Sequence, residues 1–384
     1  MGDTGQLKNK VVYFKNLDIL RFLAVMMVLI AHAYEGWCGW FGKKPGVLTI
    51  AGNHNDFTFF GNWVNTAFLN GGFGVDLFFL ISGFLITYLL IVEKLTIGKI
   101  NIWKFYTRRI LRIWPAYFLL LALAPIAVKL VNASQPDYVP NLLFYNNFHA
   151  ISIKLWQYPF AHLWSICVEE HFYLIWPIIV LFIPTNKIKS TIVALIVCSI
   201  LFRCLLQFSH AEFWSFYLNT FARIDVLLIG ALFAVHYKEH GFNLFLSKSM
   251  RVIIYSLFIL FFFADSIYSY TGLFDVTLKK YFYVLVSGFA MCNFIFNPNP
   301  LFKIPCERLF NYLGKISFSI YLFSNVLIPI IVVKCMYKWG LDNFYLFIFL
   351  NILFSILVSI IVFELVEKQV LKFKGRFAVI DTSR

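Results

Sequence analysis

The sequence predicts an all-α protein, a polytopic membrane helix bundle of about ten transmembrane helices with both termini in the cytoplasm. Of its 384 residues, 60% are hydrophobic and only 14% are charged, whereas soluble globular chains carry about 25% charged residues. The mean hydropathy is +0.76. A chain of this composition is too apolar to have a water-soluble surface. The sequence therefore excludes most soluble enzyme folds, disordered chains and nucleic-acid-binding domains.

The expected spans follow from the lengths of the apolar stretches, because a transmembrane helix needs about 20 mainly apolar residues. Ten stretches meet this requirement: residues 17–34, 71–92, 110–131, 162–184, 188–208, 214–236, 251–269, 281–297, 316–334 and 343–366. The two longest connections, 35–70 and 132–161, are expected on the outside. We predict a single integral-membrane domain over residues 1–384, with no appended soluble domain.

The distribution of basic residues sets the predicted orientation. The formal net charge is +14, and with a cytoplasmic N-terminus 22 of the 33 Lys and Arg residues fall at the inner side and eight at the outer side. Cytoplasmic loops of membrane proteins carry such an excess. A basic balance is also typical of proteins with an anionic partner, but the topology accounts for it without nucleic acid.

Several catalytic signatures are missing from the sequence. The seven cysteines and eight histidines form no cluster with metal-ligand spacing, so no metal site is expected. The sequence contains no Walker A loop, no G-x-S-x-G elbow and no H-E-x-x-H motif. ATP hydrolysis, a serine triad and zinc proteolysis therefore lack support.

Ionisable residues interrupt the first span. At membrane depth a charged group costs at least about 2.5–3.5 kcal/mol, so each one is a candidate functional residue. Arg21 and His32 are eleven residues apart, which places them on one helix face and about 16 Å apart along the axis. Asp18 lies one turn before Arg21 and can pair with it. The alternatives are a cytoplasmic anchor for Arg21 and an interfacial, hydrogen-bonded histidine for His32.

The fourth span carries a polar stripe. His162, Ser165, Glu169 and Tyr173 recur at helical spacing and share one face. Glu170 is offset from this stripe by about 80°. Carboxylates beside histidines are typical of general acid–base catalysis. The alternative is a structural polar network between helices.

The second and sixth spans also carry charges. Asp76 lies among glycines that suit close helix packing, and Arg223 and Asp225 lie near the middle of the sixth span, where they can form an ion pair that holds the bundle. The predicted topology brings four residues into the outer half of the membrane, where they would line a cavity: His32, Asp76, His162 and Glu169.

The inner loop 93–112 is the most basic segment of the chain. It includes Arg108, Arg109 and Arg112. Such a cluster can bind phosphate groups, or it can be a topology signal alone.

Six segments, in this order and over nearly the whole chain, resemble the acyltransferase 3 family of membrane acyltransferases. They are LDILRFLAVMMVLIAH, which resembles the family's Arg-x10-His motif at Arg21 and His32, GVDLFFLISGFLI at 74–86, FYTRRILRIWPAYF at 105–118, HLWSICVEEHFYLIWP at 162–177, FARIDVLLIGALFA at 221–234 and LGKISFSIYLF at 313–323.

The resemblance implies transfer of an acyl group, usually acetyl, from cytoplasmic acyl-CoA to a hydroxyl of a surface or exported glycan, in the cytoplasmic membrane of a bacterium. It implies that His32 is the essential histidine and Arg21 its motif partner. With the polar pattern, it leads to three groups of candidate residues: catalytic His32, Glu169 and Glu170; donor-binding Arg21, Arg108, Arg109 and Arg112; substrate-binding Asp76, His162, Ser165, Tyr173, Arg223 and Asp225.

A mechanism follows from these assignments as a hypothesis. Acetyl-CoA enters as a co-substrate from the basic loop, and the acceptor is a glycan or a lipid-linked saccharide at the membrane. His32 takes the proton of the attacking hydroxyl while Glu169 orients its imidazole, or His32 is itself acylated as a relay. The competing function is a secondary transporter or flippase, which intramembrane charges suit equally well.

Overall fold

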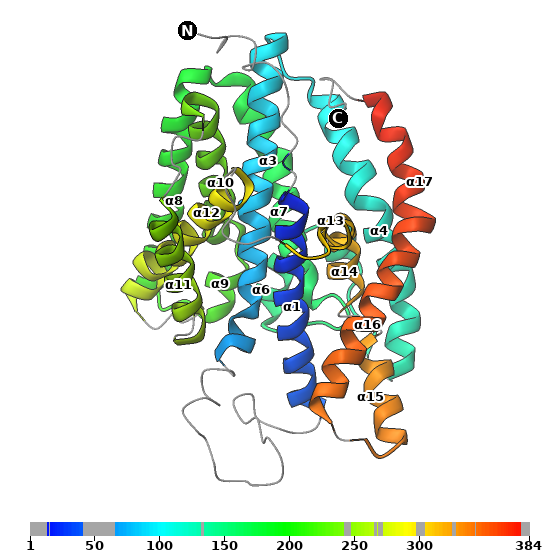
Figure 1. Ribbon diagram of the computed structural model, residues 1–384. Coiled ribbons are helices and arrows are strands. Elements are labelled where there is room, and N and C mark those ends of the chain that lie inside the picture. The colour runs from blue at the N-terminus through cyan, green and yellow to red at the C-terminus, as the bar shows by residue number, and fades with distance from the viewer. Residues whose placement is uncertain are drawn as a thin grey trace.

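A computed structural model describes most of the chain, and every regular element within the described residues is a helix. The described residues are 14, 16–40, 66–131, 134–241, 247–264, 267, 272–296, 304–324, 328–341 and 343–377. Most long helices run along one common direction (Figure 1). The expected all-α class is thus confirmed. Much of the expected outer loop 35–70 and the ends of the chain lie outside the described residues.

Within the described residues, seven helical stretches are long and apolar enough to cross a membrane. They are Leu17–Cys38, Thr66–Ile97, Ile102–Leu130, Ala161–Phe182, Thr185–Phe208, Phe213–His240 and Phe344–Phe377. They include α1 (Leu17–Trp40), α3 (Phe73–Ile97), α4 (Ile102–Val131), α7 (Trp164–Phe182), α8 (Ile188–Phe208), α10 (Thr220–His240) and α16 (Phe344–Val362). Seven of the ten expected stretches therefore correspond to these helices.

The other three expected spans are short or interrupted, so the count of ten is not confirmed. The stretches 251–269 and 281–297 correspond to α11 (Lys248–Ala264) and α12 (Lys280–Phe296), which have 17 residues each. The stretch 316–334 is not one continuous helix. There α14 (Ser317–Phe323) ends and α15 (Ile328–Lys338) begins, after the amphipathic α13 (Glu307–Lys315).

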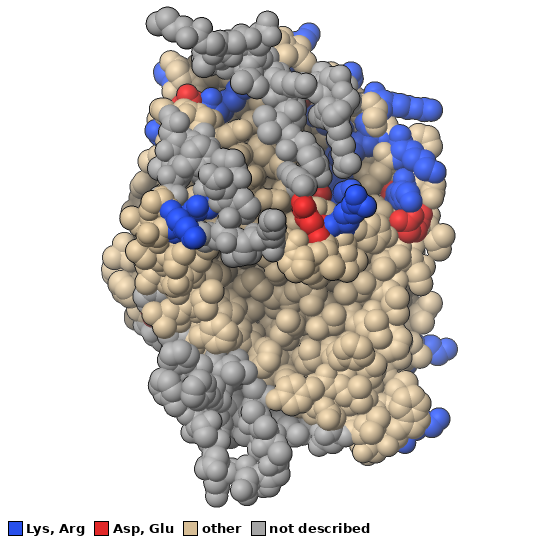
Figure 2. All heavy atoms as spheres, viewed as in Figure 1, with Lys and Arg blue, Asp and Glu red and all other residues tan. Residues whose placement is uncertain are grey.

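The bundle is apolar on its outside, as a lipid-facing surface requires. On α8 an exposed stripe recurs every three or four residues, formed by Val193, Val197, Leu201, Leu205 and Phe208. On this face of the molecule, Lys and Arg gather towards the upper end, above a broad region without charge (Figure 2). In Figure 1, α1 begins and α16 ends towards that same end. The basic end is the expected cytoplasmic side, which stays a prediction.

Two glycines bring α3 and α10 into backbone contact at the centre of the bundle. A Cβ atom at Gly83 would lie 1.8 Å from the carbonyl oxygen of Leu227, and one at Gly230 would lie 2.2 Å from that of Leu80. Small residues permit this close approach of membrane helices. The pair fixes α3, which carries Asp76 and Ser82, against α10, which carries Arg223 and Asp225.

We expect Gly83→Val to lower stability by at least about 1–3 kcal/mol, because the added side chain must push apart two packed backbones. The thermal unfolding midpoint of the purified chain in detergent measures this effect. Gly36→Ala is the control, because a Cβ at Gly36 meets nothing within 4 Å. Equal midpoints for the two variants would contradict the assigned contact.

Candidate functional site

A cavity lies between α1, α3, α4, α7 and α14, inside the helix bundle. Its empty space, including the open mouth, is about 740 Å³. Its polar lining residues are Arg21, Ser82, Arg109, Arg112, Ser165, Glu169, Tyr173, Ser317 and Tyr321. Six of the thirteen residues predicted from the sequence therefore line one cavity.

Three arginines from two helices line one part of this cavity. Arg21 on α1 pairs with Asp18 at 3.1 Å, one turn earlier, as expected. Arg112 on α4 lies 3.9 Å from the Glu367 carboxylate. Arg109 shares the face of Arg112 because the two are three residues apart.

Arg109 is held by aromatic rings instead of a carboxylate. Its guanidinium carbon lies 5.7 Å from the ring centroids of both Phe105 and Tyr173. Arg108 points elsewhere: it pairs with Glu93 at 3.4 Å and does not line the cavity. Of the four predicted donor-binding arginines, three line the cavity.

Glu169 is the cavity's carboxylate, and its position follows from the stripe on α7. Ser82 Oγ on α3 donates a 2.8 Å hydrogen bond to Glu169 Oε1. Ser165 and Tyr173, four residues before and after Glu169, line the same cavity. These three residues of the predicted stripe thus form one wall of the cavity.

A chain of hydrogen bonds links α14 to the start of α7 in the cavity wall. Ser165 Oγ lies 2.6 Å from the Tyr321 hydroxyl, which donates a 2.6 Å bond to the His162 carbonyl. The His162 ring is buried and bonds through Nε2 to the Leu322 carbonyl at 3.1 Å. Tyr321 was absent from the predicted site, although it lies within the LGKISFSIYLF segment.

His32 lies on the same helix as Arg21 but is not among the cavity-lining residues. It is within electrostatic range of His162. Its Nδ1 atom is buried and has no hydrogen-bond partner among the described residues. Glu169 bonds to Ser82 rather than to His32, so the expected orienting bond is not formed in this structure.

Glu170 lies apart from Glu169, as its offset on the helix predicts. Its Oε1 atom is buried, with no hydrogen-bond partner in the described part of the chain, and the Trp114 indole lies close to it. Of the three predicted catalytic residues, Glu169 alone lines the cavity.

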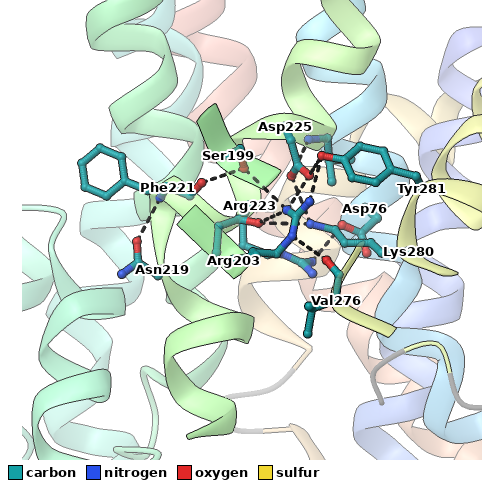
Figure 3. A network of polar contacts seen from close by, with 12 residues as sticks. Asp76, Ser199, Arg203, Asn219, Phe221, Arg223, Asp225, Val276, Lys280 and Tyr281 are labelled. Atoms are coloured by element: carbon teal, nitrogen blue, oxygen red, sulfur yellow. Dashed lines mark hydrogen bonds and ion pairs between the residues drawn. The ribbon is translucent and has the colours of Figure 1, made fainter. Parts of the chain in front are cut away.

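The remaining predicted residues belong to a separate buried charge network (Figure 3). Arg223 donates a 2.8 Å hydrogen bond to Asp76, which links α10 to α3. Its guanidinium carbon also lies 5.5 Å from the ring centroid of Trp164 and 5.3 Å from that of Tyr217. The expected Arg223–Asp225 pair is replaced by this contact between helices.

Asp225 instead holds two cations. It lies 2.5 Å from Arg203 on α8 and 3.0 Å from Lys280 on α12. Tyr281 donates a further 2.5 Å hydrogen bond to it. Arg203 is fully buried and also donates 2.7 Å bonds to the carbonyls of Val276 and Ala222. This cluster joins three helices and is not part of the cavity.

Comparison with known proteins identifies the family of the fold. A family model described as an acyltransferase domain, acyltransferase 3, matches residues 14–364. O-acetyltransferase OatA of Staphylococcus aureus strain NCTC 8325 / PS 47 is 27% identical over 94% of this chain and 57% of its own length. OatA of strain COL gives the same values. No solved structure matches.

The match covers nearly all of this chain but only part of its relatives. The chain spans a little over half the length of these O-acetyltransferases. The matched region includes every residue that lines the cavity. Because the family model covers most of the sequence, the chain belongs to the acyltransferase 3 family.

Proposed function

We propose that this protein is a membrane O-acyltransferase that moves an acetyl group from acetyl-CoA to a hydroxyl of a surface or exported glycan. One observation carries the proposal most directly: a single intramembrane cavity joins three arginines to a carboxylate and a hydroxyl cluster. The family and the O-acetyltransferase relatives support the reaction type.

The arginine-lined part of the cavity suits the donor. Coenzyme A carries phosphate groups at one end of a long flexible arm and the acyl thioester at the other. Guanidinium groups bind phosphates through paired, charge-assisted hydrogen bonds. Arg21, Arg109 and Arg112 would hold the nucleotide at the basic, cytoplasmic end, while the arm reaches towards Glu169 and Ser82.

The transfer step exchanges one bond for another. The acceptor oxygen attacks the thioester carbon, the new C–O bond forms and the C–S bond breaks. A base takes the hydroxyl proton, and the departing thiolate receives a proton in turn. His32 is the proposed base, and it interacts electrostatically with His162, whose backbone carbonyl accepts a hydrogen bond from the cavity residue Tyr321.

The acceptor is proposed from the relatives and the site. The OatA relatives are O-acetyltransferases by name, which favours a hydroxyl acceptor, and a glycan or lipid-linked saccharide offers hydroxyls at the membrane. The cytoplasmic membrane of a bacterium is the proposed location, since acetyl-CoA is a cytoplasmic metabolite.

Membranes that contain the chain, supplied with labelled acetyl-CoA, test this function by mass spectrometry of glycolipids and polysaccharide. We expect label to enter a saccharide only when the chain is present. Arg109→Gln should reduce the incorporation at limiting acetyl-CoA about tenfold or more, whereas the exposed Arg376→Gln should retain it. Saccharide moved across the membrane without label would instead establish the transporter alternative.

A further inference from the structure

The end of the described chain returns to the cavity's arginine helix. After α17 (Lys368–Leu371), the 3-10 helix η7 (Lys372–Phe377) packs against α4. Arg108 Nη1 donates a 2.8 Å hydrogen bond to the carbonyl oxygen of Phe377. Figure 1 shows α17 beside α4. The C-terminal segment is thus fixed beside Arg109 and Arg112.

One lysine of η7 faces these arginines. Lys374 is half-buried, whereas Lys372 and Arg376, two residues before and after it, are exposed. Lys374 lies within electrostatic range of four arginines, namely Arg21, Arg108, Arg109 and Arg112. Five cations from three segments of the chain therefore lie within electrostatic range, and three of them, Arg21, Arg109 and Arg112, line the cavity.

Two of these five cations have no ion-pair partner in the described part of the chain. Arg21 pairs with Asp18, Arg108 with Glu93, and Arg112 with Glu367. The two cations without such a partner among the described residues are Arg109 and Lys374.

Arg109 also has an unsatisfied hydrogen-bond donor. Its Nε atom is buried without a hydrogen-bond partner among the described residues. Uncompensated cations that are crowded together and partly buried are costly. An anion bound between α4 and η7 would remove this cost.

We infer that Lys374 and Arg109 form a binding site for phosphate groups of the donor nucleotide, so that the C-terminal segment completes the donor site. This inference rests on the proposed function. The shared chemistry is a phosphate group, and a phospholipid headgroup is its other source. A lysine binds phosphate as a point charge, while arginine adds directional hydrogen bonds.

Binding of coenzyme A to the purified full chain in nanodiscs of neutral phosphatidylcholine tests the inference without requiring activity. Lys374→Gln should weaken binding about tenfold. Lys372→Gln removes the same charge from the same segment, at a residue that bonds only to Gln369 in the described contacts, and should change affinity less than twofold. Lys374→Arg should restore binding, and pyrophosphate should compete with coenzyme A on the wild-type chain.

Equal losses for the two glutamine variants, or no loss for either, would overturn the inference. The inference would also be overturned if pyrophosphate did not compete with coenzyme A and if phosphatidylglycerol in the nanodisc did compete with it. That result would identify a lipid headgroup site. The proposed function can fail independently of this inference. If coenzyme A binding depends on Lys374 but the chain transfers no acetyl group, the phosphate site stands and the proposed function fails. Acetyl transfer with no effect of Lys374→Gln would leave the function standing without this site.

Discussion

Replacing His32 by alanine is expected to reduce acetyl transfer about 10²–10⁴-fold, the usual contribution of a general base, while the amount of folded protein stays unchanged. The expectation rests on the position of His32 on the helix of Arg21 and on its buried Nδ1 atom, which has no hydrogen-bond partner among the described residues. The rate of label transfer from acetyl-CoA in membranes, divided by the amount of protein, measures the effect.

His240→Ala is the matched control for this variant. His240 is an exposed histidine at the end of α10, paired with Glu239 and stacked on His236. Its replacement should leave the rate unchanged. Full activity of His32→Ala would make His32 an interfacial histidine without a catalytic role.

The second large effect is expected at Asp225, the centre of the buried network. Asp225→Leu should destabilise the fold by about 3–5 kcal/mol, because it leaves Arg203 and Lys280 buried without their carboxylate. The thermal unfolding midpoint and the yield of monodisperse protein in detergent report the loss. Glu239→Gln, at an exposed acidic residue of the same helix, should be neutral. Normal stability together with lost transfer would instead give Asp225 a role in the reaction.

Much of the site could be predicted from helical spacing. Ser165, Glu169 and Tyr173 face one cavity because residues four apart share a helix face. The same geometry explains the error at Arg223 and Asp225. Residues two apart on a helix point in different directions, so the two residues pair with different helices.

Other features depend on tertiary contacts that the sequence does not display. Apolar composition predicts one span over 316–334, but it carries no signal for the end of α14 at Phe323. Tyr321 enters the cavity wall because α14 packs beside the start of α7. Lys374 belongs to a basic run that the positive-inside rule already explains, and only the packing of η7 on α4 distinguishes it.

The structure of the full chain with coenzyme A, determined by cryo-electron microscopy, is the most direct test of the donor cavity. We predict phosphate density between Arg109 and Lys374 and the thiol end directed towards Glu169 and Ser82, inside the cavity between α1, α3, α4, α7 and α14. An empty cavity at saturating coenzyme A, or coenzyme A bound elsewhere on the bundle, would contradict the account.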